Sequence, residues 1–149
     1  MNAEATSEAA QGVTGRCLCG AVRFSAAVPK LAFGVCHCGM CRRWASGPFF
    51  SLGVDQLEFE GGDNIGVYQS SEWGERGFCR QCGSALFWRM HDGSHTEVAV
   101  GALDKSDGLT FAHEVFIDEK PAYYEFANAT EQMTGAELFA KYAGNANDD

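Results

Sequence analysis

The sequence has little positive charge and no long hydrophobic run, and each shortage excludes a class of protein. Eleven Lys and Arg residues stand against 20 Asp and Glu residues, which gives a formal net charge of -9. Nucleic-acid binding depends on basic contacts to phosphate, so this balance argues against a nucleic-acid partner. No run of 18 apolar residues occurs. We therefore expect no transmembrane helix and no membrane partner.

The N-terminal stretch MNAEATSEAAQG also lacks the basic start and the apolar core of a secretory signal. This absence predicts a cytoplasmic protein. We expect a disordered tail at residues 1–12, one zinc-binding domain at residues 13–142 and a flexible acidic tail at residues 143–149. A chain of 149 residues that is 46% hydrophobic can form a single compact core.

Cysteine, in contrast, is abundant, and the seven residues fall into three tight groups. CLCG contains Cys17 and Cys19, CHCGMC contains Cys36, Cys38 and Cys41, and CRQCG contains Cys79 and Cys82. An odd number cannot pair completely into disulfides, and clustered cysteines in a reducing compartment more often bind metal or carry out chemistry. Scattered buried cysteines would not cluster in this way.

Short strands separated by glycine and small polar residues dominate the rest of the chain, which predicts a mainly β fold. The expected strands are AVRFSAAV, FGVC, PFFSL, QLEFE, GVYQS, ALFWR and TEVAVGAL. One helical turn is expected at residues 39–45. Thr134 and Glu137 have the spacing of a capping box and predict a short C-terminal helix through LFAKYA.

Two groupings of the cysteines are compatible with their spacing. CxC and CxxC pairs can each present two sulfurs to one tetrahedral zinc ion at about 2.3 Å. Cys17, Cys19, Cys79 and Cys82 can form a closed site, and so can Cys38 and Cys41 with Cys79 and Cys82. Glycine follows both Cys19 and Cys82, where it would permit the tight turn that brings amide groups to sulfur. This pattern favours the first grouping.

The two groups then have different expected roles. Four thiolates saturate a zinc ion, so the first site would be structural and would contribute to folding. Cys36, Cys38 and Cys41 leave a fourth position open, and a metal there would lower the pKa of a bound thiol. Zinc suits such sites better than an iron–sulfur cluster, which stays an alternative.

Arginine and histidine supply the remaining candidate site residues. Five of the seven arginines lie within three positions of a cysteine, where they would balance thiolate charge or bind a substrate carboxylate. Arg42 and Arg43 directly follow the second group, and Trp44 and Phe49 are candidates for the wall of a pocket. His37, as the middle residue of CxC, is expected to point away from the metal. The other candidates for a fourth ligand are His91, His95 and His113, with His113 tested first.

Four segments resemble the glutathione-dependent formaldehyde-activating family, which also includes centromere protein V. They are GRCLCGAVRF, CHCGMCRRWASG, FCRQCGSALFW and HEVFIDEKPAYYEF, in the family's order and spacing over residues 13–126. The resemblance implies an Mss4-like fold of twisted antiparallel sheets. It also implies a structural zinc on Cys17, Cys19, Cys79 and Cys82 and a second zinc on Cys36, Cys38 and Cys41. Tyr123 and Tyr124 depart from the family pattern, which often has Trp after KPA.

The activity that the resemblance implies is a carbon–sulfur lyase or synthase, as in S-(hydroxymethyl)glutathione synthase. Its partners would be glutathione or a similar small thiol and a small aldehyde such as formaldehyde. Cys36, Cys38 and Cys41 would be catalytic, and Arg42 or Arg43 would bind the substrate. The alternatives are a non-catalytic binding module held together by zinc and a redox protein whose clustered thiols oxidise reversibly.

Overall fold

The computed structural model describes residues 11–148, with side chains described through residue 142. The chain divides into two compact units, which are described separately. Unit 1 comprises residues 11–32 and 51–110, and unit 2 comprises residues 33–50 and those from 111 onward. The predicted N-terminal tail lies outside the described residues except for Gln11 and Gly12, which are not part of a tail because strand β1 begins at Gln11.

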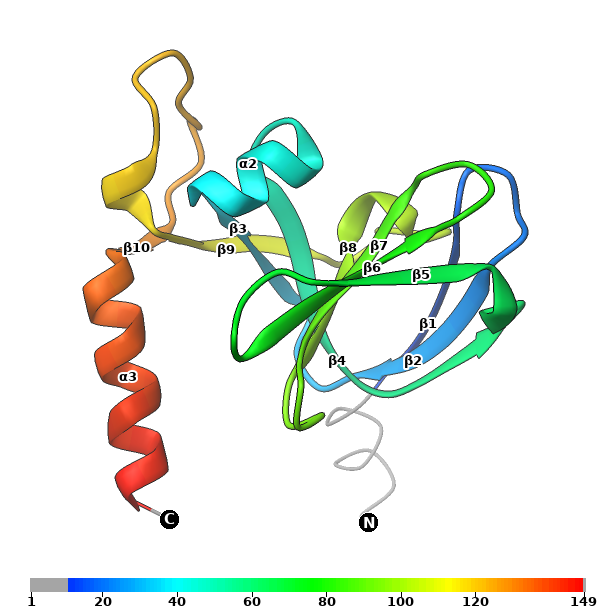
Figure 1. The fold of residues 1–149 in the computed structure, drawn as a ribbon. Coiled ribbons are helices and arrows are strands. Elements are labelled where there is room, and N and C mark those ends of the chain that lie inside the picture. Colours follow the sequence, from blue (N-terminus) through cyan, green and yellow to red (C-terminus); the bar gives the residue numbers. More distant parts are fainter. Residues whose placement is uncertain (1–10, 149) are drawn as a thin grey trace, which may run out of the picture. The chain divides into compact units, whose positions relative to one another are not determined.

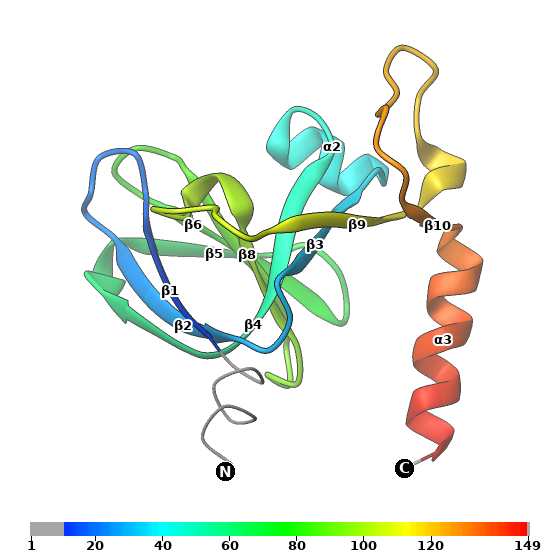
Figure 2. The ribbon, with the colours of Figure 1, turned by 180° about the vertical axis from the view of Figure 1, so that it is seen from behind.

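Unit 1 is an antiparallel sheet in which all neighbouring strands run in opposite directions (Figures 1 and 2). Two short 3-10 helices, η1 (Gly62–Asn64) and η2 (Val100–Ala102), lie between strands. The strands, in spatial order, are β1 (Gln11–Arg16), β2 (Arg23–Val28), β4 (Phe49–Glu60, from Ser51 in this unit), β8 (Thr96–Ala99), β7 (Ala85–Met90), β6 (Gly74–Cys79) and β5 (Ile65–Gln69).

Strand β4 is one continuous strand, whereas the sequence predicted two, PFFSL and QLEFE. Residues 51–54 pair with β8, and residues 55–60 pair with β2. The change of partner coincides with a β-bulge and with a left-handed backbone at Gln56, where φ is 54°. A bulge bends a strand without ending it. Within unit 1 this strand therefore has two neighbours, and the chain stays extended where the sequence predicted a break.

Glycines in the strands of unit 1 lie directly across from aromatic rings. Gly77 pairs with Phe87, and a Cβ atom at Gly77 would lie 2.1 Å from the Phe87 ring. Gly15 pairs with Phe24 in the same way, with a closest approach of 2.3 Å. The half-buried ring of Phe59 contacts the buried rings of both Phe24 and Phe87. The absence of a side chain at these glycines is therefore what allows the aromatic core to pack against the sheet.

Three strands of unit 2 lie in the order β10–β9–β3. Strand β10 runs parallel to β9, with Glu131 opposite His113, whereas the paired strands of unit 1 are antiparallel. The elements are β3 (Ala32–Cys36), α2 (Gly39–Ala45), β9 (Thr110–Val115), η3 (Ile117–Glu119), β10 (Glu131–Met133) and α3 (Gly135–Asp148). The helical turn expected at residues 39–45 is thus confirmed as α2.

Four half-buried aromatic rings form a cluster in unit 2. Phe33 stacks on Phe111 with ring centroids 5.3 Å apart, and Phe126 meets Phe111 edge-on at 5.0 Å. Phe50 contacts all three rings. Offset and edge-on contacts are the preferred arrangements of aromatic pairs. Four rings from separate segments therefore hold β3, β9 and the loop that follows η3 in place.

The capping box predicted for the C-terminal helix is present. The amide of Glu137 donates to the Thr134 hydroxyl at 3.1 Å, and the Thr134 amide donates to the Glu137 carboxylate at 2.7 Å. Phe116 and Phe139 pack edge-on beside this end of the helix, at 5.9 Å. The helix runs through Asp148, so it extends beyond residue 142, at which the domain was expected to end.

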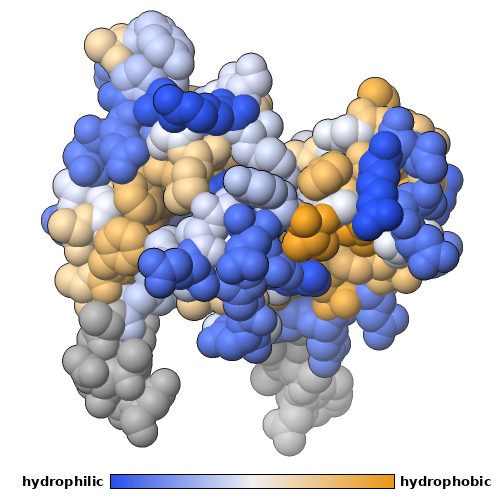
Figure 3. All heavy atoms as spheres, in the orientation of Figure 1, coloured by the Kyte–Doolittle hydropathy of each residue, from blue (hydrophilic) through white to orange (hydrophobic). Residues whose placement is uncertain are grey.

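The fold is mainly β with a C-terminal helix, as expected, and the Mss4-like assignment stays a prediction. On the face that Figure 3 displays, hydrophilic and hydrophobic residues are interspersed in each unit. Among the described helices, none has both the length and the hydrophobicity needed to cross a membrane.

We predict that Gly77→Ala destabilises the protein by about 1–3 kcal/mol, because its methyl group would overlap the Phe87 ring. Gly12→Ala is the matched control, since no atom lies within 4 Å of the added Cβ in the same kind of structure. Denaturant unfolding of both variants measures the difference. Equal stability of the two variants would show that the sheet tolerates a side chain opposite Phe87.

Candidate metal centres

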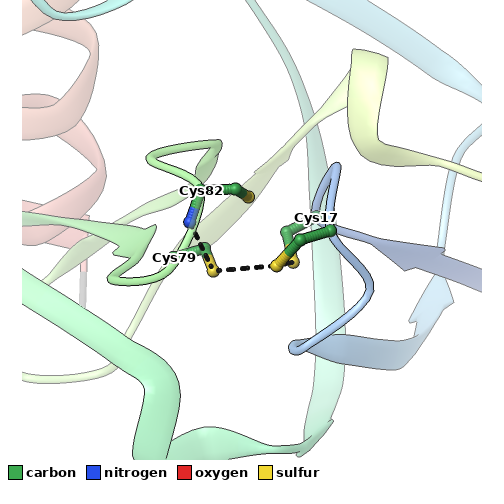
Figure 4. Close-up of side chains that lie close together, drawn as sticks. Cys17, Cys79 and Cys82 are labelled. Atoms are coloured by element: carbon green, nitrogen blue, oxygen red, sulfur yellow. Dashed lines mark hydrogen bonds between the residues drawn. The ribbon is translucent and has the colours of Figure 1, made fainter.

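Four cysteines from two separate turns of unit 1 converge on one point. Cys17 and Cys19 follow β1, whereas Cys79 ends β6 and Cys82 lies in the turn before β7. Their sulfur atoms all lie within 4.8 Å of one another. Figure 4 shows the side chains of Cys17, Cys79 and Cys82 directed toward a common centre. We call these four residues the four-cysteine cluster.

The spacing of these sulfurs fits a tetrahedral zinc ion. The sulfur of Cys19 lies 3.7 Å from that of Cys17 and 3.8 Å from that of Cys79. A tetrahedron with metal–sulfur bonds of about 2.3 Å has sulfur atoms about 3.8 Å apart. Disulfide bonds are excluded at these separations because bonded sulfurs lie about 2.05 Å apart. The four-cysteine cluster therefore has both the ligand type and the geometry of a closed zinc site.

Backbone amides stabilise thiolate charge in the four-cysteine cluster. The amide of Val22 donates to the Cys17 sulfur at 3.3 Å, and the amide of Gln81 donates to the Cys79 sulfur at 3.3 Å. The glycines that follow Cys19 and Cys82 both have left-handed backbones, with φ of 81° at Gly20 and 82° at Gly83. Other residues rarely adopt this conformation, so the predicted use of glycine in both turns is confirmed.

Ser84 joins the two turns of the four-cysteine cluster. Its hydroxyl oxygen accepts from the amide of Leu18 at 2.9 Å and lies 3.2 Å from the Cys82 sulfur. The Ser84 hydroxyl, together with backbone amides, lowers the pKa of Cys82 to about 5. Arg16 donates to the carbonyl oxygens of Cys17 and Leu18, both at 3.1 Å. Arg16 therefore supports the first turn through its backbone.

The three remaining cysteines gather in unit 2. Cys36 ends β3, Cys38 is the N-cap of α2 and Cys41 lies in the first turn of that helix. Their sulfurs also lie within 4.8 Å of one another, and no His, Asp or Glu of the described chain joins them. We call these residues the trio. Within the described chain, the trio offers three ligands of one type and no fourth.

Hydrogen bonds within the trio favour one thiolate. The thiols of Cys36 and Cys41 bond to the Cys38 sulfur and hold its pKa far below the usual range, against the effect of burial. The same interaction with Cys38 raises the pKa of Cys36. The amide of Cys41 also donates to the Cys38 sulfur, at 3.4 Å. The trio thus gathers negative charge in the place where a cation would need it.

The residue between the two ligands of the CxC pair points away from the trio, as expected. His37 is fully buried. Its Nε2 lies 2.7 Å from Oε1 of Glu114, and its Nδ1 lies 2.7 Å from the hydroxyl of Tyr124. Its backbone is bonded as well, because its amide donates to Val115 at 3.1 Å and its carbonyl accepts from Nε of Arg42 at 2.9 Å. Hydrogen bonds at both ring nitrogens, at the backbone amide and at the carbonyl therefore hold His37 in one orientation.

Glu114, on β9, is the buried partner of His37 and is only 2% exposed. Burial opposes its ionisation, but hydrogen bonds from Thr130 and His37 outweigh this effect and lower its pKa. The Thr130 hydroxyl donates to Oε2 of Glu114 at 2.6 Å. Glu114 is therefore a charged group held in a single orientation.

The two arginines after the trio occupy different environments. Arg42 is half-buried and bonds to the carbonyl of His37, whereas Arg43 is exposed and bonds to the carbonyl of Gly39 at 3.2 Å. Both guanidinium groups therefore lie against the backbone of the loop that carries the trio. Neither has a salt bridge to a carboxylate within the described chain.

The remaining candidates from the sequence lie elsewhere. His91 pairs with Glu75 at 3.0 Å, and His95 pairs with Glu97 at 2.7 Å. The ring of His113 packs over Gly34, so a Cβ there would lie 2.2 Å from it. These three histidines join neither cysteine cluster. Trp44 and Phe49 contact each other edge-on at 5.2 Å, and Phe49 is buried.

Three residues of the network beside the trio were not among the site residues predicted from the sequence: Glu114, Tyr124 and Thr130. They lie 77, 87 and 93 positions after His37, so no local spacing links them to it. The departure noted at Tyr124 is the nearest signal. It marks a position whose hydroxyl bonds to His37, a partner that no local pattern indicates.

Comparison with known proteins identifies relatives over most of the chain. The family model for the glutathione-dependent formaldehyde-activating enzyme matches residues 12–119. A protein of Schizosaccharomyces pombe, named an uncharacterized lyase, is 36% identical over 126 residues, which are 83% of this chain and 92% of that protein. A protein of Halomonas elongata, whose name assigns it provisionally to the formaldehyde-activating enzymes, is 36% identical over 83 residues, which are 49% of this chain and 53% of its own.

A crystal structure of a Rhodobacter sphaeroides protein superposes with a TM-score of 0.54 at 24% identity, covering 61% of this chain and 87% of that one. This likeness concerns the fold alone. The family model spans both cysteine pairs of the four-cysteine cluster and all of the trio. This match, together with the relative in Schizosaccharomyces pombe that aligns along most of its length, shows that the chain belongs to the glutathione-dependent formaldehyde-activating enzyme family.

Proposed function

We propose that the protein is a zinc-dependent carbon–sulfur lyase or synthase that acts on a glutathione-type thiol and a small aldehyde such as formaldehyde. The observation that carries the proposal is the trio, which gathers three cysteine sulfurs and no fourth protein ligand within the described residues. Membership of the family, and the name of the relative in Schizosaccharomyces pombe, support an enzyme of the lyase class.

The two cysteine groups have separate roles in this proposal. The four-cysteine cluster would hold a structural zinc that is saturated by thiolate and stabilises unit 1. The trio would hold a second zinc, and such an ion lowers the pKa of a thiol that binds at its open position. Its protein ligands would be the sulfur atoms of Cys36, Cys38 and Cys41, which would supply negative charge and three of the four positions around the ion. The fit of the sulfur positions supports this division.

The proposed reaction joins the thiol sulfur to the carbonyl carbon of the aldehyde. A C–S bond forms, the π bond of the carbonyl breaks, and the oxygen receives the proton that the thiol gives up. The reverse sequence is the lyase direction. Arg42 and Arg43 would bind a carboxylate of the thiol substrate, because both lie on the helix that carries Cys41 and guanidinium groups bind carboxylates well.

We predict that Cys38→Ser keeps the fold and loses activity, whereas Cys79→Ser unfolds the protein. Loss of a ligand from a closed zinc site removes folding energy, but loss of one from an open site removes chemistry. Zinc content, thermal unfolding and turnover of glutathione with formaldehyde measure the three effects. Equal loss of folding in both variants would contradict the division of roles.

Measurements of zinc content, glutathione binding and turnover on the wild-type protein separate the enzyme from the alternative of a binding module held together by zinc. A wild-type protein with two zinc ions that neither binds glutathione nor turns over would favour the module. Calorimetry with glutathione detects binding without requiring a reaction.

We predict that Arg42→Gln or Arg43→Gln raises the KM for glutathione about 10- to 100-fold, because a charge-assisted hydrogen bond contributes about 1.5–3 kcal/mol. Cysteamine, a thiol without a carboxylate, should react equally well with these variants and the wild type. Arg23→Gln, on exposed strand residue Arg23 of unit 1, is the matched control. An equal loss with both thiols would exclude a role in carboxylate binding.

A further inference from the structure

Burying the pair of His37 and Glu114 costs free energy, and the position of the pair beside the trio suggests what role it has. Moving a carboxylate and an imidazole out of water costs free energy, and a well-packed apolar pair is often at least as stabilising. Here every polar atom is bonded: no buried side-chain nitrogen or oxygen of the described residues lacks a partner. Such a network contributes orientation more than stability.

This hydrogen-bond network fixes the orientation of the CxC pair, Cys36 and Cys38. Successive side chains of an extended segment point to opposite sides, so Cys36 and Cys38 can face a common centre only while His37 faces the other way. Glu114 bonds to His37 Nε2 at 2.7 Å and Tyr124 bonds to Nδ1 at 2.7 Å. These bonds hold the middle residue and thereby both of its cysteine neighbours.

Glu114 is itself held from two directions. Its backbone belongs to β9, which pairs with β10 so that Glu114 lies opposite Gln132. Its second carboxylate oxygen accepts from Thr130 at 2.6 Å. A chain of hydrogen bonds therefore runs from Thr130 through Glu114 to His37. His37 in turn lies between two cysteines of the trio in the sequence.

We propose that Glu114 is a positioning residue for the trio, acting through His37 to set the affinity of the trio for metal. The inference rests on one part of the proposed function, metal binding by the trio, and is independent of the reaction. Glu114 contacts neither the metal nor the substrate in this account. Partners outside the ligand shell that orient ligands commonly change metal affinity 10- to 100-fold when they are substituted.

The test is a chelator titration of the full-length zinc-loaded protein, in which release of the two zinc ions is followed with a chromogenic chelator. Cys38→Ser identifies the step that belongs to the trio. We expect Glu114→Gln, which keeps the size and removes the charge, to lower the zinc affinity of that step 10- to 100-fold. The step of the four-cysteine cluster should not move.

Two further variants make the result specific. Thr130→Val keeps the shape of Thr130 and removes only the hydrogen bond to Glu114, so it should weaken the same step less, and it remains informative if Glu114→Gln does not fold. Glu131→Gln makes the same chemical change at an exposed residue of β10 and should leave both steps unchanged.

Three results would overturn the inference. The first is a trio affinity within about twofold of wild type in both Glu114→Gln and Thr130→Val, and the second is an equal weakening of both steps, which would indicate general destabilisation. The third is a wild-type protein with only the zinc of the four-cysteine cluster, which would overturn the proposed function as well. Two bound zinc ions with the expected shift, but no turnover of thiol and aldehyde, would contradict the reaction alone.

Discussion

The contact between the sulfurs of Cys19 and Cys79, 3.8 Å apart and 60 residues apart in sequence, is the constraint on which the rest depends. It brings the turn after β1 to the turn after β6 and completes a set of four thiols in unit 1. With four thiols already grouped there, the trio in unit 2 is a separate group. In our proposal, the difference between four possible ligands and three gives the first cluster a structural role and the second a chemical one.

Both clusters could be predicted from the sequence because metal ligands come in short local motifs. CxC and CxxC place two sulfurs by backbone geometry alone, and the glycines after Cys19 and Cys82 marked the two turns that meet. The start of helix α3 was also predictable, since Thr134 and Glu137 cap it locally, whereas its extent through Asp148 was not. These features depend on residues a few positions apart.

What the sequence did not reveal depends on distant pairing. Strand β4 looked like two strands because Gly53 and Asp55 separate the two predicted segments, although the chain stays extended there while its partner changes from β8 to β2. Glu114 and Thr130 gave no signal as partners of His37. Their contacts arise only when β9 and β10 bring them beside the loop of the trio. A sequence alone does not show that a carboxylate is buried, because burial of a charge depends on a partner that is distant in the chain.

The role that we propose for the trio is to hold a zinc ion with one position open to a thiol. Zinc X-ray absorption on the full-length protein tests this role, because it measures the mean number of sulfur atoms around the bound zinc ions. The account predicts a mean sulfur number between three and four in the free protein, rising to four on addition of glutathione. A sulfur number of four before glutathione is added, unchanged afterwards, would contradict the account.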